Sequence, residues 1–274
     1  MSTVPVQFDI TGDVAVITLN RPESRNAMNR ALVEGVLESF ARAQAASQVR
    51  AIVLTGADPT FCAGADLKEL MDSGARETEA RVDLSAKLYA AAPALTKPVI
   101  GAINGHALAG GFGLAMSCDL VVASEQAEFG LPESQRGLVA ALVMVALSRL
   151  LSPRHALDLL LTGRRVSAAE ALELGLVNEV RPKEEVLSRA LELARLLAAN
   201  EPTALGITKS LFYRVADSNV AGGIEQSRLS NLLFRSFATA QGGAREFVAG
   251  EPPEANAPAW TSGAKAEAIS VEDT

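Results

Sequence analysis

The sequence predicts an α/β fold in the N-terminal half of the chain and an α-helical C-terminal half. Short β-branched runs alternate with helix-period segments up to about residue 134, after which one helical pattern follows another. The 274 residues are 49% hydrophobic and 21% charged, an ordinary globular composition. This length is enough to bury a sizeable core as one large α/β unit with an appendage.

The N-terminal half opens with a strand at 14–19 (VAVITL), which turn residues bound on both sides. Asn29 is expected to cap a helix whose buried face carries Leu32, Val33, Val36, Leu37 and Phe40. A wholly apolar strand at 51–55 indicates burial on both faces. The remaining elements expected in this half are a loop at 56–64, a helix opening at 66–71 and strands at 99–103 and 120–123.

The alternation of strands and helices in the N-terminal half predicts right-handed crossovers between its parallel strands. In the C-terminal half, apolar residues at helical spacing predict a series of helices. These helices are expected at 143–151, 155–161, 168–174, 184–199, 204–215 and 223–239. The last segment, 250–274, is rich in proline and in small or acidic residues, so we expect a flexible tail.

Charge and composition exclude several classes of partner. A net charge of −7 without a basic stripe argues against nucleic-acid binding. The longest apolar run, Leu138 to Leu147, falls well short of the ~20 residues that a membrane-spanning helix needs. Two cysteines and two histidines make a disulfide framework or a zinc site improbable. With no secretory signal evident, we expect a soluble, cytoplasmic protein without a metal.

Two loop-to-helix junctions share one design. "FCAGADL" leads through Gly64 and Ala65 into a helix, and "LAGGFGL" leads through Gly110 and Gly111 into another. Backbone N–H groups at a helix start have no partner within the helix, and a small residue there lets an oxygen approach. Two such groups converging on one point would form an oxyanion hole. Glycines before a helix also serve tight turns and close packing, so spacing alone leaves both interpretations open.

Several segments, in this order and separation, strongly resemble the crotonase (enoyl-CoA hydratase/isomerase) superfamily over about Phe8 to Gly250. They are FCAGADLKEL at 61–70, NGHALAGGFGLAMSCD at 104–119 and FGLPE at 129–133, with LNRPESRNAMN at 19–29 and LTGRRVSAAEALELGLVNEV at 161–180. The resemblance implies a crotonase-like spiral of ββα repeats over residues 1–200. It also implies a helical trimerisation region at 201–250, with the flexible tail at 251–274.

The resemblance further implies an acyl-CoA thioester as substrate, with coenzyme A as part of that substrate and no separate cofactor. The N–H groups of Ala65 and Gly110 would hold the thioester oxygen, and Glu133 matches a family catalytic acid. A homotrimer or a dimer of trimers is expected. The positions matching family residues that bind coenzyme A or substrate are Arg25, Ala63, Asp66, Leu67, Gly111 and Phe237.

Glu133 also makes physical sense as an acid/base, because the apolar surroundings in FGLPE raise the pKa of a carboxyl group. A helix N-terminal acid favoured by the helix dipole is the alternative, and we favour catalysis. His106 is expected to be structural, and Cys62 is expected to pack as a small hydrophobic residue.

The sequence departs from the hydratase pattern at Gly113, where hydratases of this family carry a second glutamate. Hydration uses two carboxylates, whereas migration of a double bond from position 3 to position 2 needs one base. The sequence therefore predicts an enoyl-CoA hydratase/isomerase-type enzyme of fatty-acid or related acyl-CoA metabolism, which performs either hydration of a 2-enoyl-CoA or migration of a double bond from position 3 to position 2. If it is an isomerase, migration is expected to be the faster reaction. The alternatives are a non-catalytic acyl-CoA-binding homologue and, third, a CoA-ester hydrolase.

Overall fold

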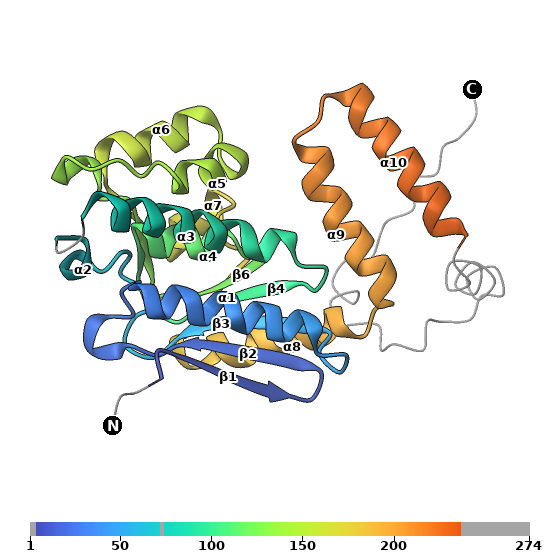
Figure 1. Ribbon diagram of the computed structural model, residues 1–274, viewed down its shortest axis with the longest axis horizontal. Helices are drawn as coiled ribbons and strands as arrows, with labels where there is room; N and C mark the ends of the chain where they lie inside the picture. The colour runs from blue at the N-terminus through green and yellow to red at the C-terminus, as the bar shows by residue number, and fades with distance from the viewer. Residues whose placement is uncertain (1–3, 72–73, 237–274) are drawn as a thin grey trace, which may run out of the picture.

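The computed structural model describes residues 4–71 and 74–236, in which two sheets and their helices form an α/β body (Figure 1). The larger sheet has the order β1-β2-β3-β4-β6-β9, and only its β1–β2 pair is antiparallel. Its strands are β1 (Val6–Thr11), β2 (Val14–Leu19), β3 (Ala51–Gly56), β4 (Val99–Ile103), β6 (Leu120–Ser124) and β9 (Glu179–Arg181). The smaller sheet has the order β5-β7-β8, with β5 (Ala107–Leu108), β7 (Glu128–Gly130) and β8 (Arg165–Ser167).

The chain alternates between the two sheets, which makes the path a spiral. Strand β4 of the large sheet is followed by β5 of the small one, and β6 is followed by β7. Strand β3 obeys the same rule, because Cys62 follows it and forms a parallel bridge with Ala107 of β5. Each turn thus places one segment in each sheet, and the predicted fold class is confirmed.

Two apolar layers cover the large sheet, because successive side chains of a strand point to opposite faces. One face carries Val14, Val53, Ile100 and Val122 and packs on α8 (Val186–Ala198) through its alanines. The other face belongs to the main core with α1 (Arg30–Ala45) and the buried residues of α3 (Ala75–Ala94) and α4 (Gly110–Met116). The remaining helices of the body are α2 (Leu67–Met71), α5 (Val143–Leu150), α6 (Pro153–Thr162) and α7 (Ala168–Glu173), with short 3-10 turns at Pro22–Ser24, Ser134–Arg136 and Lys183–Glu185.

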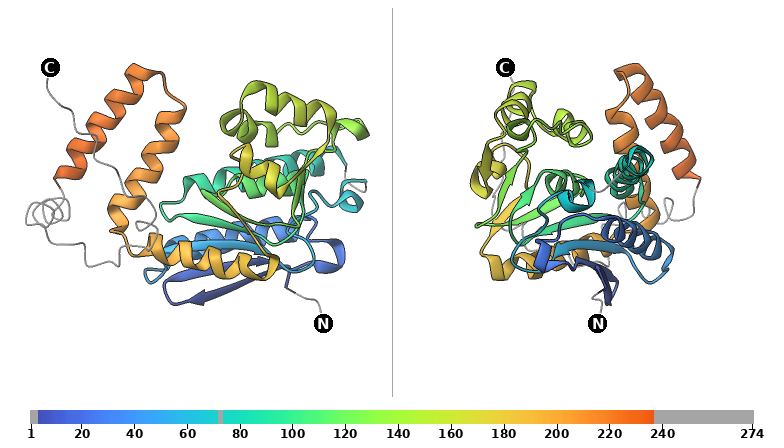
Figure 2. Two further views of the ribbon diagram at one scale, coloured as in Figure 1. Left: turned by 180° about the vertical axis from the view of Figure 1, so that it is seen from behind. Right: turned by 60° about the vertical axis from the view of Figure 1, so that its left-hand side comes forward.

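The last two described helices, α9 (Pro202–Ala216) and α10 (Val220–Arg235), form a hairpin that stands away from the sheets (Figures 1 and 2). Helix α9 is anchored by Lys209, whose ammonium group lies 2.6 Å from the Asp119 carboxylate and also donates to the carbonyls of Ala92 and Lys97. Tyr213 donates to the other Asp119 oxygen at 2.8 Å. No helix within the described ranges is long and apolar enough to span a membrane.

The predicted elements agree with this architecture in outline. Asn29 caps α1 as expected, accepting from the Leu32 N–H at 3.0 Å. The division into an α/β front and a purely helical back is wrong in one respect, because β8 and β9 arise from the back half. They complete one edge of each sheet. The tail at 250–274 and the end of the helix expected at 223–239 lie outside the described residues.

Candidate active site

Three parallel segments of the small sheet bring the predicted catalytic residues to one edge. Cys62 pairs with Ala107, and Ala107 pairs with Phe129 of β7, all in the parallel sense. Ala65 and Gly110 each follow their paired residue by three positions, and Glu133 follows Phe129 by four. Because the carboxyl ends of parallel strands meet at one edge, the spiral collects residues that are far apart in the sequence.

The peptide N–H of Ala65 is left free by the pairing around it. Met28 donates to the Gly64 carbonyl at 2.7 Å and accepts from the Asp66 N–H at 3.1 Å, so the bridge uses the groups on either side of Ala65. Ala65 itself is exposed. Its N–H donates to no residue that the structure describes, and it is therefore available to a ligand oxygen.

The Gly110 N–H opens helix α4, where the first amide groups have no partner within the helix. Ala109 precedes it with a φ of +51°, a region that L-residues rarely adopt. This conformation is held by the Ala109 N–H, which donates to the carbonyl of Gly130 at the end of β7 at 2.8 Å. A Cβ atom built on Gly110 would lie 3.8 Å from the Ala65 nitrogen, so the two N–H groups are neighbours.

Gly111 allows α4 to begin this close to the 61–67 loop. A Cβ at this position would overlap the carbonyl oxygen of Cys62. Cys62 is fully buried, its thiol donates to the Asn26 carbonyl at 3.1 Å, and burial raises its pKa to about 12. The thiol therefore stays protonated at neutral pH, in agreement with its interpretation as a packing residue.

Glu133 lies just after β7, at the start of the 3-10 turn. Its Oε2 atom is buried without a hydrogen-bond partner among the described residues, and burial raises the pKa of the carboxyl group. A carboxyl group with a raised pKa and a vacant oxygen is suited to accept a proton and return it within one reaction.

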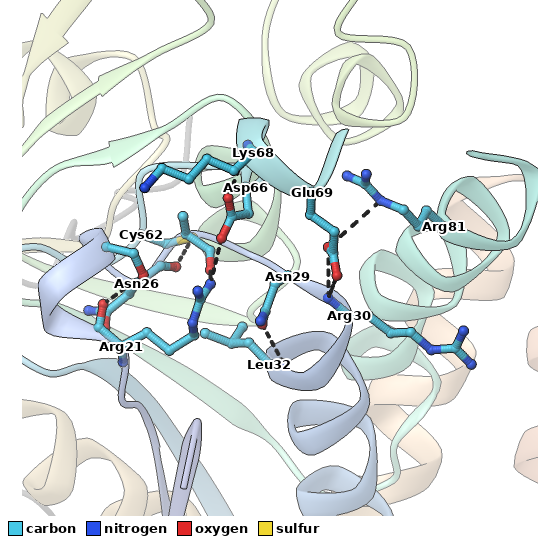
Figure 3. A network of polar contacts seen from close by, with 12 residues as sticks. Arg21, Asn26, Asn29, Arg30, Leu32, Cys62, Asp66, Lys68, Glu69 and Arg81 are labelled. Atoms are coloured by element: carbon cyan, nitrogen blue, oxygen red, sulfur yellow. Dashed lines mark hydrogen bonds and ion pairs between the residues drawn. The ribbon is translucent and has the colours of Figure 1, made fainter. Parts of the chain in front are cut away.

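The residues expected to bind coenzyme A lie on the two loops beside the Ala65 nitrogen. Arg25 is exposed and its carbonyl accepts from the Ala63 N–H at 3.0 Å, while Leu67 is exposed at the start of α2. Asp66 pairs with Arg21 at 3.0 Å and accepts from the Lys68 N–H, which makes it part of the polar network that fixes the loop (Figure 3). Phe237 lies outside the described residues.

Sequence reasoning missed two residues that shape the site. Asn26 is fully buried at a φ of +54°, donates to the carbonyls of Ala57 and Thr60, and accepts from the Arg21 N–H. Asparagine tolerates this left-handed region better than most residues, so an asparagine at position 26 was the sequence signal for this backbone conformation. Tyr89 of α3 donates to the Gly110 carbonyl at 3.1 Å.

His106 accepts from the Glu128 N–H at 3.1 Å, consistent with a structural role.

Comparison with known proteins agrees with this geometry. The family model for enoyl-CoA hydratase/isomerase matches residues 9–255. The chain belongs to the enoyl-CoA hydratase/isomerase family. It is 40% identical over 245 residues to a putative enoyl-CoA hydratase of Thermus thermophilus, covering 88% of this chain and 97% of that protein. It is 38% identical over 205 residues to the short-chain-enoyl-CoA hydratase of Clostridium acetobutylicum, covering 74% and 78%.

Solved structures of this family show the same fold. The enoyl-CoA hydratase of Geobacillus kaustophilus superimposes with a TM-score of 0.86 at 34% identity, covering 91% of this chain and 97% of that one. The expected membership in the crotonase superfamily is confirmed.

Proposed function

We propose that this enzyme binds acyl-CoA thioesters with the thioester oxygen between the Ala65 and Gly110 N–H groups, and that Glu133 is its acid/base. The single observation that carries the proposal is the pair of neighbouring, unengaged N–H groups. Preorganised donors of this kind stabilise a developing oxyanion by about 3 kcal/mol each. Coenzyme A enters as part of the substrate, and the proposed reaction uses no further cofactor.

The favoured reaction is migration of a double bond from position 3 to position 2 of the acyl chain. The Glu133 carboxylate takes a proton from carbon 2, and the electron pair of that C–H bond moves to form the dienolate, whose negative charge rests on the thioester oxygen. The same carboxyl group then returns the proton to carbon 4, which leaves the double bond between carbons 2 and 3. Gly113 supports this choice, because it provides no second carboxylate.

Hydration of a 2-enoyl-CoA is the second candidate, favoured by the hydratase names of the relatives. The test is incubation with 2-enoyl-, 3-enoyl- and 3-hydroxyacyl-CoA esters followed by chromatography with mass detection. Hydration adds one water, migration changes the retention time at constant mass, and hydrolysis releases free coenzyme A. A protein that only binds acyl-CoA would return every ester unchanged.

Glu133→Gln is the matched variant for this test. The amide keeps the shape of the side chain and cannot shuttle a proton, so we expect turnover to be abolished while affinity for an acyl-CoA changes only a few-fold. Calorimetric binding and turnover are measured on the same preparations. Turnover within a factor of two of the wild type would show that Glu133 is not the acid/base.

We also propose that the enzyme assembles as a homotrimer or a dimer of trimers through the hairpin of α9 and α10. Helix α10 exposes Ile224, Leu229, Leu232 and Leu233, each by more than half of its surface. These residues therefore do not serve the core of the part of the chain that the structure describes, and we assign them to a contact between subunits.

A further inference from the structure

The tyrosine beside the oxyanion hole has no role in the proposed reaction so far. Tyr89 lies on α3 next to the buried Leu88, and its hydroxyl donates to the Gly110 carbonyl at 3.1 Å. A Cβ atom built on Gly110 would lie 2.7 Å from this hydroxyl oxygen and 3.8 Å from the Ala65 nitrogen. The phenol group is therefore next to Gly110, which supplies one of the two proposed donors.

The ring of Tyr89 fills the space beside Gly113. A Cβ built on Gly113 would lie 3.0 Å from Tyr89 Cε1, 3.3 Å from Tyr89 Cζ and 2.8 Å from Val143 Cγ2. All three distances are shorter than ordinary contacts between carbon atoms. A side chain at residue 113 and the ring at residue 89 thus compete for one volume.

The hydroxyl also lies within electrostatic range of the acid/base. Burial is the main cause of the raised pKa of Tyr89, and the negative charge of Glu133 adds to it, so the phenol stays protonated. Its single hydrogen is committed to the Gly110 carbonyl. Tyr89 therefore cannot deliver a proton to the substrate without breaking the contact that holds the Gly110 peptide.

We propose that Tyr89 determines which reaction this site performs. Its ring occupies the space in which a second carboxylate on residue 113 would lie, and its hydroxyl positions the Gly110 end of the oxyanion hole. This inference rests on the proposed function and deepens it. Tyr89 restricts the pocket to chemistry with one carboxylate, which is double-bond migration.

Four proteins test the steric part: the wild type, Tyr89→Ala, Gly113→Glu and the double variant Tyr89→Ala/Gly113→Glu. Gly113→Glu alone should lower the Tm by several degrees, because the new side chain meets the ring and Val143. In the Tyr89→Ala background the same substitution should lower the Tm by clearly less. Equal shifts in both backgrounds would overturn the proposed competition for space.

The catalytic part is read from the ratio of hydration to migration, measured with 2-enoyl- and 3-enoyl-CoA esters of the same chain length. The double variant should raise this ratio at least tenfold over Tyr89→Ala, since it gains a carboxylate in the vacated space. An unchanged ratio would overturn the role of Tyr89 in reaction choice. A wild type that converts neither ester would refute the proposed function, and with it this catalytic part, while the Tm comparison still decides the steric part.

Tyr89→Phe separates the hydroxyl from the ring and guards against a misfolded alanine variant. It should lower kcat several-fold with little change in KM or in the ratio, because Gly110 loses its anchor while the ring still excludes a second carboxylate. The control is Tyr213→Phe, which removes the other tyrosine hydroxyl and its bond to Asp119 away from the site. Its kcat should equal that of the wild type. A selective loss of hydration in Tyr89→Phe would instead identify the hydroxyl as a ligand of the attacking water and contradict our inference.

Discussion

At the scale of single residues, the site depends on where the main chain runs more than on which side chains it carries. Ala65 and Gly110 present free N–H groups because Met28 and Gly130 engage the peptide groups next to them. Glu133 is the exception, since its side chain is half-buried and its buried Oε2 atom has no hydrogen-bond partner among the described residues. Backbone geometry and one carboxyl group can therefore be tested separately.

Gly111→Ala tests the backbone geometry. The added methyl group would overlap the Cys62 carbonyl, so α4 has to move away from the 61–67 loop and carry the Gly110 N–H with it. We expect a loss of about 3 kcal/mol in unfolding free energy, the upper end of what overpacking costs, together with a large fall in kcat. Denaturant unfolding and turnover are the measurements.

The matched control for that variant is Gly74→Ala. Gly74 has a negative φ and open space around its Cβ position, so both stability and turnover should stay near the wild-type values. If Gly111→Ala behaved like this control, close approach at the start of α4 would not be what positions the Gly110 donor.

The carboxyl group is tested by pH. Burial raises the pKa of Glu133 in the folded enzyme, so the neutral form persists to higher pH than for an exposed glutamate. The proposed base must be ionised, and kcat/KM for double-bond migration should therefore rise with pH through a midpoint above the ordinary value of about 4.3. A midpoint at or below that ordinary value would contradict the assignment.

At the scale of elements, α9 depends on a buried ion pair. The side chains of Lys209 and Asp119 are 8% and 16% exposed, and breaking such a pair by removing one partner leaves an uncompensated buried charge. Lys209→Ala should therefore lower the unfolding free energy by about 3 kcal/mol in denaturant titration. Lys87→Ala, an exposed lysine on α3, should change it by less than about 0.5 kcal/mol. Similar values for both variants would show that α9 does not depend on this pair.

The sequence predicted most elements with strong periodicity and missed the short ones, and it also missed β1, although its residues VQFDIT alternate between apolar and polar. The four inner strands are apolar runs, and α1 shows both its cap and its buried face. Helix α3 was missed because only Leu88 and Ala92 are buried along its twenty residues. Because α3 was not predicted, Tyr89 on this helix was not identified as a residue near the site. The strands β5, β8 and β9 have two or three residues each, and pairing with distant segments defines them instead of local pattern.

At the scale of the whole molecule, the body and the hairpin differ in how they bury apolar surface. The body encloses its large side chains between two sheets and their helices. Of the residues in α10, only Gly223 is buried. A hairpin that keeps so little of its surface from water within one chain is suited to a contact with further subunits.

The proposed assembly predicts a trimer or a hexamer by light scattering at micromolar concentration. Leu232→Asp should dissociate it, because Leu232 is 57% exposed in the single chain and a charge there harms only a subunit contact. Leu157→Asp is the control, a leucine of similar exposure (52%) on α6. A monomeric wild type would refute the assembly.

The two proposed oxyanion donors have a consequence for how this chain can vary. An amide N–H belongs to every residue except proline, so no other substitution at positions 65 or 110 deletes a donor. Substitutions of side chains around the pocket can alter the reaction while the two N–H groups still bind the thioester oxygen. The main-chain path thus determines which class of ester can bind, whereas the side chains around the pocket determine which reaction follows, and the reaction can therefore differ between related proteins.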